Sequence, residues 1–364
     1  MTNNDFATAQ STSFEKIPII DISDIHTESG FEKIATELVH VARSIGFFYI
    51  KGHNISPELI SSAFNASKRF FELPSDIKSS VEVDINQRGW MGQGMAQLEG
   101  SKTYDAKEVF FWGWDVGADD PDVISGVPMV FPNQWPDQVA PFLSVDILPY
   151  YHSVIVLSRS ILSALAYGLG NSKDFFDIAY KKPLGRGQLV YYPPMEDKDL
   201  DEQRFGASPH TDFGVLTILL QDMQGGLQVL NKDNIWIEAP PIENTFVCNI
   251  GDLLERWTNG DLVSTKHRVI NRNKNARYSI RIFCDPSSQT IINPSDFSQN
   301  PNKFEKITAR CNLLKFIWIL GEITRIYDSL TGRITKYSNG ISRIFITIYH
   351  TMFRRYQISI CPTL

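Results

Sequence analysis

The most informative part of this sequence is the segment Phe205-Gly206-Ala207-Ser208-Pro209-His210-Thr211-Asp212-Phe213-Gly214. It precedes Val215 to Leu220, a run of β-branched and aliphatic residues that predicts a strand. His210 and Asp212 are two positions apart, and strand side chains alternate faces with a period of two. If both residues lie at or near the start of that strand, the imidazole of His210 and the carboxylate of Asp212 would point to the same face. They would then supply two ligands of a metal site.

A stable metal site needs a third protein ligand, and the best candidate is His267, within Ser264 to Asn271. Two histidines and one carboxylate on one side of an ion form the facial triad of non-haem Fe(II) enzymes that activate oxygen. A surface His-Asp pair with an unrelated histidine is the alternative, because this pattern is common by chance. The neighbouring residues have to decide between the two.

A candidate anion site follows about ten residues beyond His267, where Arg277 and Ser279 share one face of a predicted strand. A guanidinium beside a hydroxyl is a good receptor for a carboxylate, because the planar fork bonds both oxygens. An arginine in a surface ion pair is the alternative. A ligand with a keto acid at one end and a carboxylate at the other, such as 2-oxoglutarate, would bridge the two sites.

Six sequence blocks in this order resemble the Fe(II)/2-oxoglutarate dioxygenases of the isopenicillin N synthase-like family, and the resemblance runs from about Ile17 to about Ala309. The blocks are His210 to Asp212, Gly225 to Val229, Asn249 to Asp252, Trp257 to Gly260, Ser264 to Val269, and Arg277 to Ser279. The resemblance implies an α+β, mainly β fold with a double-stranded β-helix (jelly-roll, cupin-like) core braced by helices.

The resemblance also implies roles for individual residues. His210, Asp212 and His267 would bind Fe(II), and Arg277 with Ser279 would bind the distal carboxylate of 2-oxoglutarate. Tyr192 matches a tyrosine that often bonds the co-substrate in this family. Val190 stands where many relatives carry asparagine, so one expected contact is missing.

The reaction implied by the resemblance uses Fe(II), 2-oxoglutarate and O2, and leaves ascorbate open as a further reductant. It would hydroxylate, desaturate or cyclise a small molecule, of the secondary-metabolite type, with release of succinate and CO2. Hydrogen abstraction in this chemistry needs no acid or base from the protein, so no such residue is predicted. Two other classes remain open: an oxidase of the same fold that does not use 2-oxoglutarate, and a binding protein that has lost catalysis.

Arg281 is the most informative departure from the family pattern, since relatives often carry proline or a small apolar residue there. It shares a face with Arg277 and should point into the barrel, where a charge needs a partner. We expect that partner to be an anionic group on the primary substrate, with an ion pair to a nearby Asp or Glu as the alternative. Phe283 and Phe213 are candidate walls of the substrate pocket by position.

The pattern along the chain predicts where the elements lie. Helical spacing is predicted for 31–44, 57–73 and 147–169, and strands for 17–22, 47–50, 188–192, 215–220, 227–230, 235–239, 245–250, 268–270 and 278–283. Many short strands separated by turns are typical of a jelly roll. The chain divides into a disordered lead-in (1–14), an N-terminal region (15–135), a linker with a bracing helix (136–184), the jelly-roll core (185–309) and an atypical extension (310–364).

Composition narrows the classes further. The net charge of −6 and the pI near 5.7 argue against a nucleic-acid binder. The four cysteines show neither CxxC spacing nor a disulfide framework, the N-terminus lacks the features of a signal peptide, and no apolar run is long enough to span a bilayer. We therefore expect a cytoplasmic protein that acts on a small molecule, and the sequence leaves its oligomeric state open.

The extension from Arg310 carries eight Lys and Arg against two Asp and Glu, a net charge of +6 on an otherwise acidic chain. Its alternating apolar stretch, Ile341 to Tyr349, is β-prone and aggregation-prone. A partner-binding or membrane-surface segment is one interpretation. We favour a gene-model artefact, such as a retained intron or a shifted frame, which the intact mass of the natural protein would test.

Overall fold

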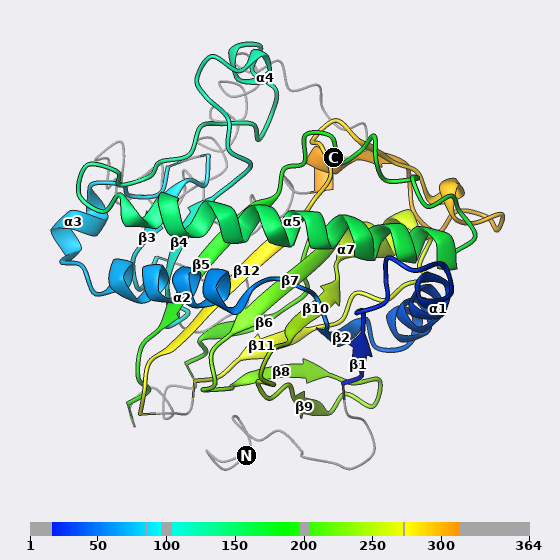
Figure 1. The fold of residues 1–364 in the computed structure, drawn as a ribbon, viewed down its shortest axis with the longest axis horizontal. Helices are drawn as coiled ribbons and strands as arrows, with labels where there is room; N and C mark the ends of the chain where they lie inside the picture. The colour runs from blue at the N-terminus through cyan, green and yellow to red at the C-terminus, as the bar shows by residue number, and fades with distance from the viewer. Residues whose placement is uncertain (1–16, 85, 96–103, 197–203, 272–273, 313–364) are drawn as a thin grey trace, which may run out of the picture.

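A computed structural model describes residues 17–84, 86–95, 104–196, 204–271 and 274–312 of the chain. The predicted disordered lead-in and residues 313–364 of the predicted extension lie outside these ranges. Figure 1 shows strands gathered into a curved core, with helices laid across it.

Two sheets form the core (Figure 1). The larger has eight strands in the order β1 (Ile19–Asp21), β2 (Phe47–Lys51), β10 (Phe246–Ile250), β7 (Leu216–Gln221), β12 (Arg277–Cys284), β5 (Arg186–Tyr192), β4 (Glu108–Trp112) and β3 (Gly89–Met91). The smaller has four, in the order β6 (Ala207–His210), β11 (His267–Val269), β8 (Leu227–Leu230) and β9 (Trp236–Glu238). All the pairings within these two sheets are antiparallel except that of β1 with β2. A separate two-stranded sheet joins β13 (Ile291–Ile292) to β14 (Ile307–Thr308).

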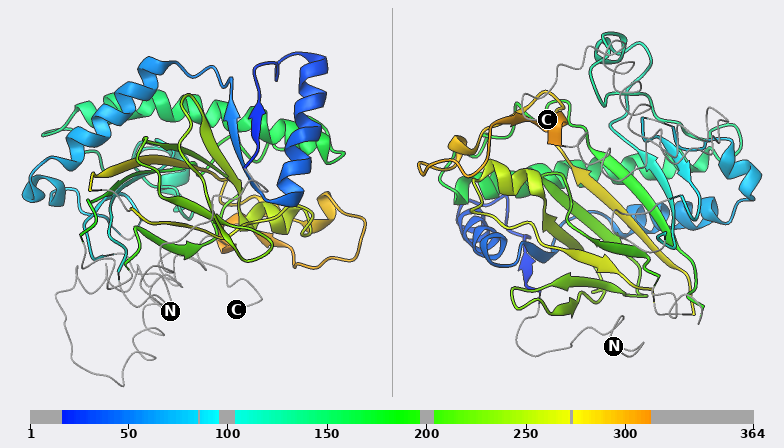
Figure 2. Two further views of the ribbon diagram at one scale, coloured as in Figure 1. Left: turned by 90° about the horizontal axis from the view of Figure 1, so that it is seen from below. Right: turned by 180° about the vertical axis from the view of Figure 1, so that it is seen from behind.

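Three long helices cover one face of the larger sheet, as the left view of Figure 2 shows: α1 (Glu28–Ser44), α2 (Pro57–Phe71) and α5 (Phe142–Gly168). Shorter helices are α3 (Ser75–Ser79), α4 (Pro121–Ile124), α7 (Asp252–Trp257) and η1 (Pro294–Asp296). Helix α1 begins where the Thr27 hydroxyl accepts a bond from Gly30 N, and it ends at Ser44, two residues before Gly46, whose positive φ of 66° suits glycine. Helix α5 is the bracing helix, and it starts five residues before the predicted position.

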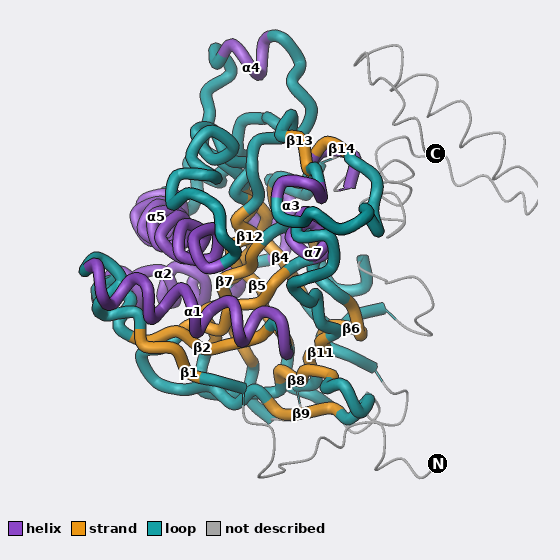
Figure 3. The backbone as a smooth tube through the Cα atoms, turned by 90° about the vertical axis from the view of Figure 1, so that its right-hand side faces the viewer, coloured by secondary structure: helices purple, strands orange, loops and turns teal. Residues whose placement is uncertain are grey.

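Side-chain alternation in the larger sheet separates two hydrophobic cores. On β12, Ile280, Ile282 and Cys284 face the helices and belong to the outer core. The inner core lies between the two sheets and includes Phe47, Val190 and Val229. The tube in Figure 3 shows β6, β11, β8 and β9 lying apart from the layer of helices, on the far side of the larger sheet. This double-sheet architecture confirms the predicted jelly-roll core.

The nine strands listed above agree with the structure to within one or two residues, whereas β3, β4, β6, β13 and β14 are not among them. One of these five carries a candidate metal ligand. That strand is β6, which carries His210 at its last position. Its sequence, Ala-Ser-Pro-His, has little strand character, and it pairs with β11 along only one edge. The N-terminal strands β1 to β4 join the same sheet as the core strands, and the domain division at 135 and 184 stays a prediction.

Candidate metal and co-substrate site

His210, Asp212 and His267 lie together at one end of the space between the sheets. His210 ends β6 and faces His267, which begins β11, as a cross-strand pair. Asp212 lies in the connection to β7, and its Oδ1 is 3.8 Å from His210 Nε2 and 3.7 Å from His267 Nε2. One ligand atom from each residue lies within 4.8 Å of the others. Three residues from two sequence regions therefore converge on one point.

Hydrogen bonds behind these side chains fix which atoms converge. The Nδ1 atom of His210 bonds the Ser208 carbonyl at 2.6 Å, and that of His267 bonds the Thr265 carbonyl at 3.2 Å. An Nδ1–H that donates to a carbonyl leaves Nε2 deprotonated and free to bind a metal. Both imidazoles are therefore oriented as ligands would be.

The carboxylate of Asp212 is oriented in the same way by two donors. Its Oδ2 accepts bonds from Thr217 Oγ1 at 2.6 Å and from Asn249 Nδ2 at 2.8 Å. Thr217 on β7 and Asn249 on β10 are direct cross-strand partners, so both donors come from the rigid centre of the larger sheet. Because Oδ2 is engaged, Oδ1 is the atom left to face the histidines.

The protonation states of the cluster suit a divalent ion. Burial, with the neighbouring His267, lowers the pKa of His210 far below its ordinary value, so its imidazole is neutral. For Asp212, burial acts to raise the pKa, but the two histidines and the bonds from Thr217 and Asn249 outweigh it and lower the pKa. Two imidazoles and one carboxylate are the donor set of a non-haem Fe(II) facial triad. The residues present therefore fit this ion.

Several supporting residues were not predicted from the sequence as parts of the site. Asp252 accepts bonds from Ser264 Oγ at 2.6 Å and Thr211 Oγ1 at 3.1 Å, and so connects the segments that carry His267 and His210. Asn249 and Asp252 belong to one of the six sequence blocks that carry the family resemblance, and the block does not reveal these contacts. Thr217 had no signal of its own in the sequence.

Arg277, at the start of β12, is fully buried. Its Nε donates to the Gly225 carbonyl at 2.7 Å, and its terminal nitrogens donate to Gln221 Oε1 at 3.2 Å and Ser279 Oγ at 3.4 Å. The ring of Tyr192, its cross-strand partner, lies 4.8 Å from the guanidinium carbon. The three predicted co-substrate residues thus lie together.

Positive charge dominates the surroundings of Tyr192. Burial acts to raise the pKa of this phenol, yet Arg281, Arg277 and Lys107 together lower it below the ordinary value. Lys107 is neutralised by Asp105, 3.0 Å away, whereas neither arginine has a carboxylate partner among the described residues. An anion is the natural ligand for such a place.

A cavity joins two of the triad residues to the predicted substrate residues. Its lining includes His210 and Asp212 together with Arg281, Phe283 and Phe213. The remaining lining residues are Gln87, Met91, Lys107, Val109, Phe111, Arg186, Gln188 and Thr211. Arg281 makes no ion pair with a carboxylate in the described part of the chain, so the local ion pair that we considered as an alternative is absent there.

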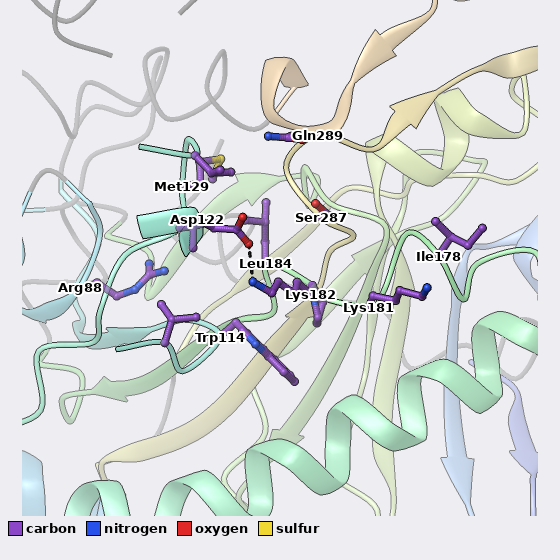
Figure 4. Close-up of a pocket in the computed structure, with 14 residues that line it drawn as sticks. Arg88, Trp114, Asp122, Met129, Ile178, Lys181, Lys182, Leu184, Ser287 and Gln289 are labelled. Carbon is purple, nitrogen blue, oxygen red and sulfur yellow. Dashed lines mark hydrogen bonds and ion pairs between the residues drawn. The ribbon is translucent and has the colours of Figure 1, made fainter. Parts of the chain in front are cut away.

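A second cavity of about 240 Å³, shown in Figure 4, contains no member of the triad. It lies between the segment around α4, the residues leading into β5 and the chain after β12. Asp122 and Lys182 face each other across it in an ion pair of 2.8 Å. Arg88 and Lys181 also line this cavity, but no cluster of metal-ligating side chains within the described ranges lies in it.

Comparison with known proteins agrees with this geometry. The 2OG-Fe(II) oxygenase superfamily matches residues 187–286, and the family described as non-haem dioxygenase in morphine synthesis N-terminal matches residues 17–138. A probable iron/ascorbate oxidoreductase of Dictyostelium discoideum is 38% identical over 304 residues, covering 76% of this chain and 83% of the relative. The 2-oxoglutarate-Fe(II) type oxidoreductase hxnY of Emericella nidulans is 35% identical, covering 81% and 82%.

Among solved structures, a full-length Neurospora crassa protein in complex with alpha-KG (2-oxoglutarate) is similar with a TM-score of 0.73 and 29% identity, over 85% of this chain and 98% of that one. A further structure of the same Neurospora protein holds alpha-KG and thymine, with a TM-score of 0.72 and 27% identity, over 87% and 99%. None of the helices in the described ranges is long and apolar enough to cross a membrane. With its jelly roll, its His-Asp-His cluster and these relatives, the chain belongs to the 2OG-Fe(II) oxygenase superfamily, whose enzymes use Fe(II), 2-oxoglutarate and O2.

Proposed function

We propose that this protein oxidises a C–H bond of a small molecule while 2-oxoglutarate is converted to succinate and CO2. One O2 is consumed; for hydroxylation, one of its oxygen atoms enters the product and the other enters succinate. Desaturation and cyclisation are the other outcomes of the same chemistry. The observation that carries the proposal is the convergence of His210, Asp212 and His267 to within 4.8 Å, at a cavity that also contains an arginine with no ion pair to a described residue.

In this proposal, Nε2 of His210, Nε2 of His267 and Oδ1 of Asp212 hold the Fe(II) ion on one side. A bound Fe(II) ion supplies the redox chemistry that uses O2, which no side chain of the chain can supply. Thr217 and Asn249 keep the Asp212 carboxylate in place, and the backbone carbonyls behind the histidines hold both rings. The protein positions the reactants and needs no acid or base.

The distal carboxylate of 2-oxoglutarate would bind Arg277 and Ser279, with Tyr192 beside it. The Gly225 carbonyl and Gln221 fix the guanidinium plane before the ligand arrives, which reduces the entropy cost of binding. The similar Neurospora crassa protein is seen with alpha-KG, which supports a keto diacid as the co-substrate here. Arg277→Leu should therefore raise the Kd for 2-oxoglutarate at least about tenfold, since a charge-assisted contact contributes about 1.5–3 kcal/mol.

The primary substrate would be a small molecule with an anionic group that binds Arg281. Phe213 and Phe283 would form apolar walls of its pocket. The Neurospora crassa protein is seen with thymine, a small molecule, and that likeness supports the size class of the substrate. We also propose a cytoplasmic location, which is supported by the lack of a disulfide framework in the sequence and by the free Cys248, Cys284 and Cys311.

The test is a screen for succinate release. The purified chain with Fe(II), 2-oxoglutarate and O2 would be incubated with a panel of small organic acids and their methyl esters. The expected result is succinate formation that rises with one acid, stays near background with its ester, and equals product formation mole for mole.

An Asp212→Ala variant is the negative control for that screen. If the wild type formed product without succinate, the protein would instead be an oxidase of the same fold that uses ascorbate. That alternative is favoured by the name of the relative described as an iron/ascorbate oxidoreductase. If the wild type neither formed product nor bound Fe(II), the protein would be an inactive homologue.

A further inference from the structure

Two polar side chains on the inner face of the larger sheet form a pair, and the proposed function assigns a role to only one of them, Arg281. Gln188 on β5 and Arg281 on β12 are direct cross-strand partners, on strands that lie side by side in Figure 1. Both line the cavity that contains His210 and Asp212. Arg281 lies four residues, or about 14 Å along the strand, from Arg277, so it is at a different level of the barrel.

Neither side chain forms a hydrogen bond in the described part of the chain. Arg281 Nε and Gln188 Oε1 are both buried without a partner there. The contact recorded for the Arg281 guanidinium is with the ring of Phe283, whose centroid is 5.8 Å away. The other two cations of this cavity are compensated: Lys107 pairs with Asp105, and Arg186 pairs with Asp285 at 3.1 Å.

Both side chains are only half-buried, but Arg281 Nε and Gln188 Oε1 are themselves buried. A buried donor and a buried acceptor without partners are both costly, because each atom has lost its water and gained nothing in return. Apolar residues at the two positions would avoid that cost, as Val190 and Leu219 do at neighbouring inward positions on β5 and β7. The two unsatisfied groups are next to each other and beside the triad. A ligand that enters the cavity is therefore the natural partner for both.

The chemistry of the pair defines that ligand. A guanidinium can only donate hydrogen bonds, whereas a carboxamide oxygen can only accept them. The complement is a carboxylate with an O–H or N–H donor close to it. 2-Oxoglutarate does not meet this requirement, because it carries no hydrogen-bond donor once both carboxylates are ionised.

We propose that Arg281 and Gln188 together select the primary substrate, and that this substrate is a 2-hydroxy or 2-acylamino carboxylic acid. Arg281 binds the carboxylate, and Gln188 Oε1 accepts the hydrogen bond from the adjacent O–H or N–H. The apolar remainder of the substrate lies against Phe213, Phe283 and Phe111. The inference rests on the proposed function, because it assigns the substrate class of the same cavity.

The test is calorimetric binding to the enzyme loaded anaerobically with Fe(II) and 2-oxoglutarate, so that no turnover is needed. Four probes separate the two contacts: mandelate and N-acetylphenylglycine have both groups, phenylacetate lacks the donor, and mandelamide lacks the charge. Mandelate or N-acetylphenylglycine should bind the wild type at least about tenfold more tightly than phenylacetate and mandelamide. Gln188→Leu should abolish the preference over phenylacetate, and Arg281→Leu the preference over mandelamide.

Arg43→Leu on α1 is the matched control for loss of one positive charge, since Arg43 pairs with Asp261 on the exterior. It should leave all four affinities unchanged. Equal affinities for the four probes in the wild type, or no binding of either acid that has the donor, would overturn the inference. So would an Arg281→Leu variant that loses affinity for 2-oxoglutarate, which would make Arg281 a co-substrate anchor.

These failures are distinguishable from failure of the proposed function. If the wild type did not bind Fe(II) and 2-oxoglutarate together, the loaded complex would not form and the proposed function itself would fall. If the complex forms and the probes do not discriminate, only the substrate class is wrong. Thermal melting of each variant confirms that it is folded before binding is compared.

Discussion

Removal of the Asn249 carboxamide is predicted to weaken metal binding although Asn249 does not reach the metal position. Its Nδ2 donates to Asp212 Oδ2 at 2.8 Å, and both groups are almost completely buried. A hydrogen bond to a charged group contributes about 1.5–3 kcal/mol, which corresponds to a factor of about 10–100 in an equilibrium constant. Loss of a group that orients a metal ligand typically costs about the same 10–100-fold. We therefore expect Asn249→Ala to raise the Kd for Fe(II) by about that factor.

The assay is anaerobic isothermal titration of Fe(II) into the wild type and the variant. Thr217→Val, which removes the other donor to the same oxygen, should have an effect of similar size. The double variant should differ from the sum of the two, because both donors act on one atom. Asn171→Ala is the matched control, since Asn171 donates to the Asp296 carbonyl at 2.9 Å and lies outside the cluster. An Asn249→Ala variant that stays folded and binds Fe(II) within about twofold of the wild type would show that this hydrogen bond does not support the metal ligand.

Three further predictions concern the scaffold. Lys78→Met should lower the free energy of unfolding in denaturant by about 3–5 kcal/mol, because it leaves Glu108 buried without the ammonium that lies 2.8 Å away. The double variant Lys78→Met with Glu108→Gln should recover part of that loss. An equal loss in both variants would contradict this expectation. Burial lowers the pKa of His53 below its ordinary value of 6.5. Its contribution to stability is therefore complete above about pH 6.5 and is lost as the pH falls below that value. His53→Phe should flatten the dependence of Tm on pH between about 7.5 and 5, whereas an unchanged slope would exclude His53 as a source of that dependence. Burial raises the pKa of Cys284 to about 12 and that of Cys248 well above its ordinary value, so iodoacetamide at about pH 8 should label neither thiol in the native protein and both after unfolding, as mass spectrometry of the peptides would show.

The fold and the convergent cluster could be predicted from the sequence because each depends on patterns that are local or ordered along the chain. Strand alternation identified the inward face of β12, and the order of six blocks identified the family. The strand β6 escaped prediction because its short Ala-Ser-Pro-His sequence takes its conformation from pairing with β11, not from intrinsic preference. The period-two argument expected His210 and Asp212 to share one strand. In the structure His210 ends β6, and Asp212 lies in the connection that follows it.

The contacts that support the cluster could not be predicted, because they join positions far apart in the chain. Asn249 and Asp212 are separated by 37 residues, and the register of β10 against β7 brings them together. The lack of a described partner for Arg281 likewise depends on where every nearby carboxylate is placed. A sequence shows that an inward charge is unusual, whereas only coordinates show that no described carboxylate compensates it.

The family resemblance is predicted to break at Arg310, and a residue just beyond that point contacts the segment that carries Asp212. Asn312 is buried, and its side chain donates to the carbonyl of Phe213, beside Asp212, at 2.9 Å. Asn312, the last residue that the structure describes, therefore contacts the residue next to the candidate metal ligand Asp212. The origin of the segment beyond it stays a prediction, tested by the intact mass of the natural protein.

An anaerobic titration of Fe(II) into the protein with 2-oxoglutarate, followed through the visible metal-to-ligand charge-transfer band, tests whether His210, Asp212 and His267 hold the ion. We expect a band that saturates at one Fe(II) per chain in the wild type and is lost in Asp212→Ala and in His267→Ala. A band of the same intensity and midpoint in those variants would contradict this expectation, because the ion would then be held by other residues.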